Sequence, residues 1–149
     1  MKTLFAYLGM LLMTITLTHG QATKSSLTKD SDFLQLMAKS LRYPQSARQA
    51  EKVAKAYIEF KIDDLGKVAD ISVLNPDNVD TSFKEETKRI MSQLPAQKPI
   101  YAGKYVLPVI FVLEGSGRVL KPREEAITFV QSLPKESILS EVYVVGYLQ

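Results

Sequence analysis

A run of alternating side chains between positions 53 and 62 constrains the fold of this chain more than any other feature. Every second residue is apolar, and most of the residues between are charged. A period of two over this length is typical of an antiparallel strand with one face on a hydrophobic core. The apolar face comprises Ala54, Ala56, Ile58, Phe60 and Ile62, and the other face comprises Lys55, Tyr57, Glu59 and Lys61.

The residues that follow predict a second strand joined by a tight turn. Residues 63–67 read Asp-Asp-Leu-Gly-Lys, and Gly66 suits the positive φ of such a turn. Residues 68–74 are β-prone, and the Asn-Pro-Asp-Asn sequence at 75–78 ends that strand. The short connection makes the two strands an antiparallel hairpin.

Three helices are predicted beside this hairpin. The first carries one apolar stripe, and Asp30, Ser31 and Asp32 are its candidate N-caps. Its stripe comprises Phe33, Leu36, Met37 and Leu41. A short helix at 44–50 begins with Pro44, which is favourable at a first helical position. The third and longest helix, 80–94, begins either at Asp80 or with a capping box of Ser82 and Glu85.

The second half of the chain predicts two further strands around a fourth helix. Residues 105–113 are strongly β-prone, and Pro108 within them favours an edge strand or a bulge because proline has no N–H to donate. A helix follows from about Lys121 and ends at Pro134, and residues 141–148 read as a last strand. The element order predicts an α+β fold, a two-layer sandwich. Its small antiparallel sheet has three core strands plus a C-terminal strand, and helices cover the sheet.

The N-terminus has the three-part pattern of a secretory signal peptide. Lys2 precedes an apolar run over residues 4–17, which is short for a membrane-spanning helix, and small residues follow it. We expect cleavage after Gly20 or Ala22, which gives an exported, periplasmic protein; an uncleaved inner-membrane anchor is the alternative. The expected organisation is a signal peptide (1–20), a disordered leader (21–29), a domain with its preceding helix (30–115) and a helix–strand extension (116–149).

The absence of Cys and the scarcity of His argue against catalysis. The chain has no Cys, and its one His, His19, lies in the signal-like segment. The exported chain therefore lacks the residues that most often serve as nucleophile and general base at neutral pH. The acidic residues near positions 63 and 80 are explained as turn and helix-start residues. We expect no enzyme activity, no metal and no cofactor, and a net charge of +3, or +2 without Lys2, gives no reason to expect nucleic acid.

An ordered set of short motifs carries a family resemblance. The motifs are Tyr43-Pro44-x-x-Ala47, the strand 53–60, the turn 63–68, the strand 71–74, Gly103-Lys104 and Leu107-Pro108-Val109-x-Phe111. Over about residues 42–115 this set resembles the C-terminal domain of TonB, the periplasmic energy transducer of Gram-negative bacteria. The sequence departs from the family pattern at Ala54, where glycine is usual, at Leu94, where an aromatic residue is usual, and in the added tail.

The resemblance implies a protein-binding role. TonB domains bind an extended segment of their receptor alongside an edge strand, by β-augmentation. Carried over by motif, the edge strand is 105–111, and the partner is an outer-membrane TonB-dependent receptor or another envelope protein. The implied site residues are Tyr105, Val106, Leu107, Val109 and Phe111.

Several alternatives stay open at this point. The strand 141–148 either pairs with that same edge from within the chain or exchanges between two copies in a homodimer, so tail and partner compete for one set of backbone groups. Residues 21–29 span only about 30 Å when extended, which is short for full energy transduction. The rival functions are an envelope structural or cell-wall-associated protein and a small-ligand binder on the same scaffold.

Overall fold

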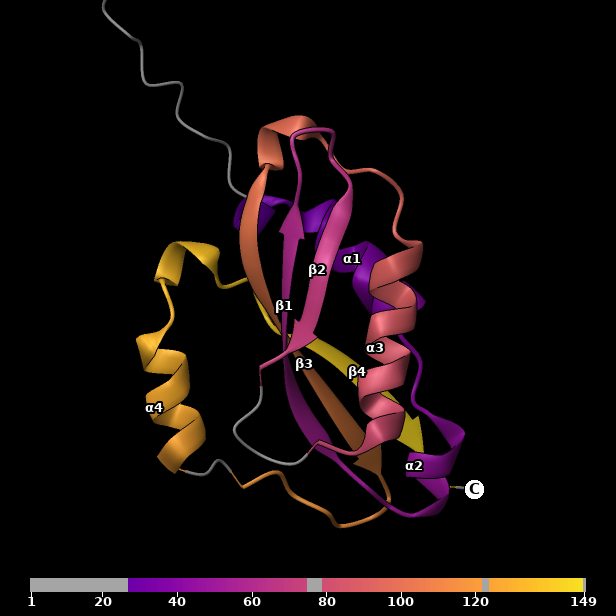
Figure 1. Ribbon diagram of the computed structural model, residues 1–149. Helices are drawn as coiled ribbons and strands as arrows, with labels where there is room; N and C mark the ends of the chain where they lie inside the picture. Colours follow the sequence, from indigo (N-terminus) through magenta and orange to yellow (C-terminus); the bar gives the residue numbers. More distant parts are fainter. Residues whose placement is uncertain (1–26, 75–78, 122–123, 149) are drawn as a thin grey trace, which may run out of the picture.

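The structure is a computed structural model that describes residues 27–74, 79–121 and 124–148 (Figure 1). The helices are α1 (Ser31–Ser40), α2 (Gln45–Gln49), α3 (Thr81–Gln93) and α4 (Glu124–Ser132). The strands are β1 (Ala54–Ile62), β2 (Val68–Val73), β3 (Gly103–Glu114) and β4 (Val142–Tyr147). Three short 3₁₀ turns complete the elements: η1 (Leu27–Lys29), η2 (Pro99–Tyr101) and η3 (Lys135–Ser137).

The predicted hairpin is confirmed, and its turn is held by side-chain hydrogen bonds. The Asp63 carboxylate accepts from the N–H groups of Leu65 and Lys67 at 3.0 and 2.8 Å. Gly66 has a φ of +83°, and a Cβ there would come within 1.9 Å of the Gln97 carbonyl oxygen. The turn therefore needs glycine for both its backbone conformation and the close approach of the 95–98 loop.

The strands form one mixed sheet in the order β2-β1-β3-β4. The pairs β1–β2 and β1–β3 are antiparallel, whereas β3 and β4 are parallel. The α+β fold with three antiparallel core strands is thus confirmed, and the expectation of a wholly antiparallel sheet is wrong. The direction of β4 differs because α4 and η3 carry the chain back along the sheet before β4 begins, as a parallel connection requires (Figure 1).

One face of the sheet packs against α1 and α3 and forms the hydrophobic core. The five apolar residues predicted for this face of β1 are all buried. Aromatic rings join the layers, with Phe83 of α3 4.4 Å from Phe111 of β3 and Phe33 of α1 5.9 Å from Phe60 of β1, centroid to centroid. The core also takes in Val142 and Val144, so β4 belongs to the folded domain.

The two helices on this face begin at aspartate caps. Asp30 accepts hydrogen bonds from the N–H groups of Asp32 and Phe33. Asp80 accepts from the N–H and hydroxyl of Ser82 at 3.0 and 2.6 Å, and the helix begins at Thr81. Asp80, the first of the two predicted caps, is therefore the one that the fold uses.

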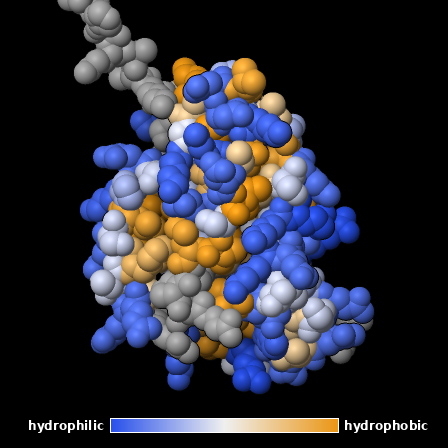
Figure 2. Space-filling view, in the orientation of Figure 1, coloured by the Kyte–Doolittle hydropathy of each residue, from blue (hydrophilic) through white to orange (hydrophobic). Residues whose placement is uncertain are grey.

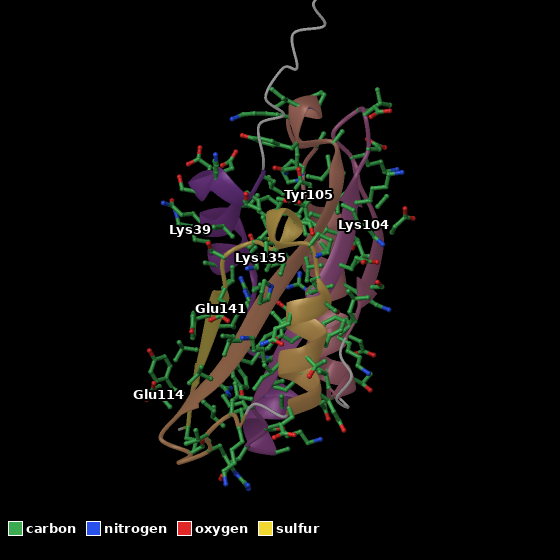
Figure 3. The ribbon with its side chains drawn as sticks, turned by 90° about the vertical axis from the view of Figure 1, so that its left-hand side faces the viewer. Lys39, Lys104, Tyr105, Glu114, Lys135 and Glu141 are labelled. Carbon is green, nitrogen blue, oxygen red and sulfur yellow. The ribbon has the colours of Figure 1, made fainter. Side chains whose placement is uncertain are left out.

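The second face of the sheet is partly covered by the tail. In Figure 3, which turns the molecule to face its second side, α4 crosses in front of the strands. The ring of Phe129 in α4 meets that of Tyr57 in β1 edge-on at 5.6 Å. Tyr57, Val106 and Ile110 are buried on this face. The expected two-layer sandwich therefore has a partial third layer, which the tail supplies.

The N-terminal expectations are only partly within the described residues. The signal-like segment, its cleavage positions and residues 21–26 lie outside them, as do the 75–78 turn and residues 122–123. The expectation of a disordered leader is wrong for residues 27–29, which form η1 and bury Leu27 completely. In the described ranges, every helix is too short or too polar to cross a bilayer.

Candidate partner-binding edge

The expected site strand lies in the interior of the sheet. β3 pairs with β1 along residues 103–111 and with β4 along residues 109–114. The five expected site residues are buried: Tyr105, Val106, Leu107, Val109 and Phe111. The expectation that 105–111 is an edge strand is wrong for residues 109–111, because β4 pairs with them on the side of β3 where a partner was expected. On that side, residues 105–108 make only the isolated bridge between Val106 and Ile138. Pairing of the C-terminal strand with this edge, the alternative left open above, is confirmed.

Pro108 sits at the point where this pairing has not yet begun. Tyr57, which lies opposite Pro108, directs its carbonyl to β2, where it accepts from Leu74 N–H at 2.9 Å. Pro108 therefore turns its nitrogen toward the β4 side. The regular ladder with β4 starts one residue later, at the Val109–Val142 pair. The proline correctly marks a missing rung, and it does not mark the whole strand as an edge.

β4 is fixed to the sheet from both ends and through its side chains. Leu139 N–H donates to the Val106 carbonyl at 2.9 Å, and Leu148 N–H donates to the Glu114 carbonyl at 3.3 Å. Lys55 of β1 forms an ion pair of 2.5 Å with Glu141, just before β4. Glu141 also accepts from the Tyr143 hydroxyl at 3.0 Å. Backbone hydrogen bonds thus attach the tail to β3, and the Lys55–Glu141 ion pair attaches it to β1.

This ion pair shifts the pKa of both partners. The hydrogen bond from Lys55 is the main reason why the pKa of Glu141 lies below its usual range. Burial by itself would lower the pKa of Lys55, but the hydrogen bond to Glu141 and the neighbouring Tyr57 together raise it. Both groups are therefore charged at neutral pH, as attachment of the tail through this pair requires.

The open edge on this side of the sheet is the outer side of β4. Figure 3 shows β4 as the outermost strand there, with Glu141 near its start and Glu114 at the far end of β3. Leu148 directs its N–H to β3, and backbone groups alternate along a strand, so Tyr143, Val145 and Tyr147 direct theirs outward. No described residue pairs with that side. The side chains of the same three residues are 57%, 43% and 64% exposed.

The sequence pattern by itself does not assign this edge. It identifies 141–148 as a strand, but places the partner on β3. The sequence holds one signal for this edge, which is the alternation of side chains along 142–147. Val142 and Val144 pack in the core, so the large side chains of Tyr143, Val145 and Tyr147 point to solvent. Two exposed tyrosines on the same face of a terminal strand, with Val145 between them, favour a recognition surface.

The opposite edge of the sheet, β2, is a poorer docking strand. A β-bulge interrupts its pairing with β1 between Ala69 and Ser72, and Asp70 within it has a φ of +53°. A bulge together with an exposed carboxylate is a common way to block strand addition. The β4 edge is therefore the better candidate.

A wide groove lies on the second face, between the sheet and residues 118–121 and 126–131. Its volume is about 1140 Å³, and Figure 2 shows hydrophobic residues between α4 and the strands. The charged groups along it are largely paired, with Lys52 bonded to Asp80 and Lys55 to Glu141. The hydrogen bond from Lys52 holds the pKa of Asp80 well below its usual range. No cluster of potential metal ligands occurs among residues 27–74, 79–121 and 124–148.

Comparison with known proteins gives one clear result. Residues 39–113 match the family described as the Gram-negative bacterial TonB protein C-terminal. No curated protein and no solved structure matches the chain. The matched segment runs from the end of α1 to the end of β3, so α4 and β4 lie beyond it. Domains of this family are periplasmic and bind proteins without catalysing a reaction, in the energy-transduction machinery of the envelope. Since the match covers 75 of the 149 residues, the chain belongs to the TonB C-terminal family.

Proposed function

We propose that this protein is an exported interaction module that recognises an extended segment of an envelope protein by main-chain pairing on the β3–β4 side of its sheet. The expected partner is an outer-membrane receptor of TonB-dependent transport. Its role is binding, and no step of it requires a nucleophile, a metal or a cofactor.

One observation carries this proposal. The chain belongs to a family of protein-binding domains, and β4 is the last strand of its sheet on the side where a partner was expected. The backbone groups on the outer side of β4 pair with no described residue. Unpaired N–H and C=O groups on an edge are satisfied by an incoming strand, which gives affinity, while alternate side chains give selectivity.

Two routes lead to such pairing. An incoming strand either adds to the outer side of β4 or displaces β4 and pairs with β3 along Tyr105–Phe111. The second route needs the buried Val142 and Val144 to leave the core, which costs the hydrophobic energy of two side chains, about 3–5 kcal/mol. A homodimer that exchanges β4 between two copies uses the same β3 groups and avoids that cost.

Site-directed photo-crosslinking in the cell envelope tests the proposed function. A benzoylphenylalanine residue is placed at Tyr147, on the β4 edge, and in a matched variant at Leu65, which is 82% exposed in the β1–β2 turn. We expect adducts with an outer-membrane receptor from position 147 and none from position 65. Equal adducts at both positions, or retention on purified peptidoglycan without any protein adduct, would contradict the proposal and favour a cell-wall-associated role.

A further inference from the structure

The geometry points to an acidic, extended segment of a partner protein as the occupant of the outer edge of β4. We propose that its backbone pairs with Tyr143, Val145 and Tyr147 and that its carboxylates meet Arg42 and Arg48. This inference rests on the proposed function and adds to it the place of docking and the chemistry of the partner.

A groove runs along this edge. It measures about 370 Å³ and lies between β4 on one side and the end of α1, the 41–44 segment and α2 on the other. We call it the β4 groove; besides the strand residues 143–147 it is lined by Ala38, Leu41, Arg42, Tyr43 and Arg48. A strand added to β4 enters this groove with the side chains that point toward the helices.

The charge of the β4 groove is positive. Its lining residues include two arginines and no acidic residue. Among the described residues neither guanidinium has an ion-pair partner. The carboxylate of Glu86 accepts from the backbone N–H of Arg42, but it is held by the Arg89 side chain in two hydrogen bonds of 2.8 and 2.9 Å. Lys39, in the last turn of α1, is a further exposed cation at this end of the helix (Figure 3).

The floor of the groove is fixed by the core. Gly146 lies against the ring of Tyr43, and a Cβ at position 146 would come within 2.7 Å of that ring. The ring itself packs edge-on against Phe83 and Phe111 at 5.6 and 5.9 Å, and its hydroxyl donates to the Lys52 carbonyl. Burial raises the pKa of Tyr43 to about 12, so this donor is kept at any physiological pH. The groove is therefore preformed, which lowers the entropic cost of docking a strand.

The two faces of an added strand have different surroundings, and this difference determines which side chains alternate along the ligand sequence. Side chains on one face point toward Arg42 and Arg48, while those on the other lie beside the exposed row of Tyr143, Val145 and Tyr147. Side chains alternate between faces along a strand. The best-suited segment therefore alternates Asp or Glu with apolar or aromatic residues.

A second copy of this chain is a poorer occupant. In a two-fold pairing of β4 with β4, the residues facing the groove are Val142, Val144 and Gly146, which offer no carboxylate to the arginines. The arginines of the two copies would also gather along one interface. Like charges brought together across a sheet are unfavourable.

Two pairs of variants test the inference on the full chain, with a short fluorescent peptide that alternates Glu with Val or Tyr as the probe. Its counterpart has Lys in place of Glu. Arg42→Gln combined with Arg48→Gln removes the groove charges, and Lys61→Gln combined with Arg118→Gln removes the same charge from exposed sites outside the groove. Val145→Pro removes an outward N–H without removing a β3–β4 hydrogen bond, and Val145→Thr is its matched control.

We expect the acidic peptide to bind the unaltered chain and the lysine peptide to bind at least about tenfold more weakly. The groove-arginine variant weakens binding of the acidic peptide about five- to tenfold, as loss of two exposed ion pairs does. Val145→Pro weakens it about tenfold, as loss of a main-chain hydrogen bond does. Both control variants bind as the unaltered chain does, and thermal melts show that every variant is folded.

Equal binding of the two peptides, or unchanged binding in both test variants, would overturn the inference. So would a dimer in light scattering that Val145→Pro converts to monomer, since a second copy is then the occupant. If receptor adducts form at position 147 in all variants alike, the proposed function stands, and only the inference that an acidic segment binds the β4 groove falls. If no adduct forms at all, the proposed function itself fails.

Discussion

Lys55 of β1 and Glu141, which precedes β4, form an ion pair of 2.5 Å across the second face of the sheet, although 86 residues separate them in the sequence. Between them lies β3, with Ile110 opposite Lys55 and beside Tyr143. The pair thus joins the first strand of the segment that matches the TonB C-terminal family to the strand that the tail adds. Its side chains are 34% and 39% exposed, so solvent screens the attraction.

Replacing Glu141 by Gln tests how much this pair holds the tail. We expect a loss of about 0.2–1 kcal/mol in the free energy of unfolding, measured with urea, because the pair is partly exposed. In a double-mutant cycle with Lys55→Gln, the effects of the two variants overlap rather than add. Strict additivity would show that the two side chains do not interact.

The same pair makes stability depend on pH in the acid range. The folded state lowers the pKa of Glu141 beneath its ordinary value of 4.5. A lowered carboxyl pKa stabilises the fold above the unfolded pKa and loses that contribution as the pH falls through the folded pKa. We therefore expect the stability difference between the unaltered chain and Glu141→Gln to be constant from pH 7 to 5 and to shrink below about 4.5. A difference that grows toward low pH would contradict this assignment.

Asp80→Ala removes the N-cap of α3 and the carboxylate that Lys52 binds. Since Asp80 accepts hydrogen bonds from Ser82 and Lys52, we expect a loss of about 1–2 kcal/mol in the free energy of unfolding. Glu85→Ala is the matched control, because Glu85 is exposed and belongs to the capping box that the fold does not use. A larger effect at Glu85 than at Asp80 would show that the helix begins at Ser82.

Gly146→Ala places a methyl group against the partly buried ring of Tyr43. The added Cβ lies 2.7 Å from two ring atoms and 3.1 Å from a Leu113 methyl, so either β4 or the ring has to move. We expect a loss of about 1–3 kcal/mol, measured by thermal melting, as is typical of overpacking. Val145→Ala, one residue away and exposed, changes stability by less than about 0.5 kcal/mol. If the two variants melt alike, Tyr43 does not pack on β4 as described.

Truncation after Ser116 removes α4 and β4 and leaves the outer side of β3 unpaired. We expect the truncated chain to be less stable, because Leu139, Val142 and Val144 leave the core, and to self-associate or bind strands more readily through β3. Size-exclusion chromatography with light scattering reports the association. A folded truncated chain that stays monomeric and binds nothing new would end the idea that tail and partner compete.

A disulfide between β3 and β4 separates the two docking routes. Val112 and Val145 are neighbours in the parallel ladder, and the chain has no other cysteine to interfere with Val112→Cys combined with Val145→Cys. Adjacent strands lie about 4.8 Å apart, within the range that a disulfide spans. The oxidised variant should still form the receptor adduct at position 147 if the partner adds to β4. Loss of the adduct on oxidation, with recovery on reduction, would instead show that β4 must leave β3.

The predictions that proved right rest on local chemistry. The alternation of Ala54–Ile62 decides which face of β1 is buried, because side-chain direction in a strand follows sequence position alone. The Asp63–Lys67 turn and the Asp30 and Asp80 caps are fixed by hydrogen bonds between residues at most four positions apart. The motifs spaced along residues 43–111 also sufficed to identify the family.

What the sequence by itself determined is therefore the identity of the elements, the core face of the sheet and the family to which the chain belongs. Only the tertiary structure decided that β4 runs parallel to β3, that Pro108 marks one absent rung within an interior strand, and that Arg42 and Arg48 flank the open edge. The physical reason is that hydrophobic periodicity and turn chemistry act between near neighbours. Strand order and groove charge depend instead on which distant segments meet, and many arrangements satisfy the same local pattern.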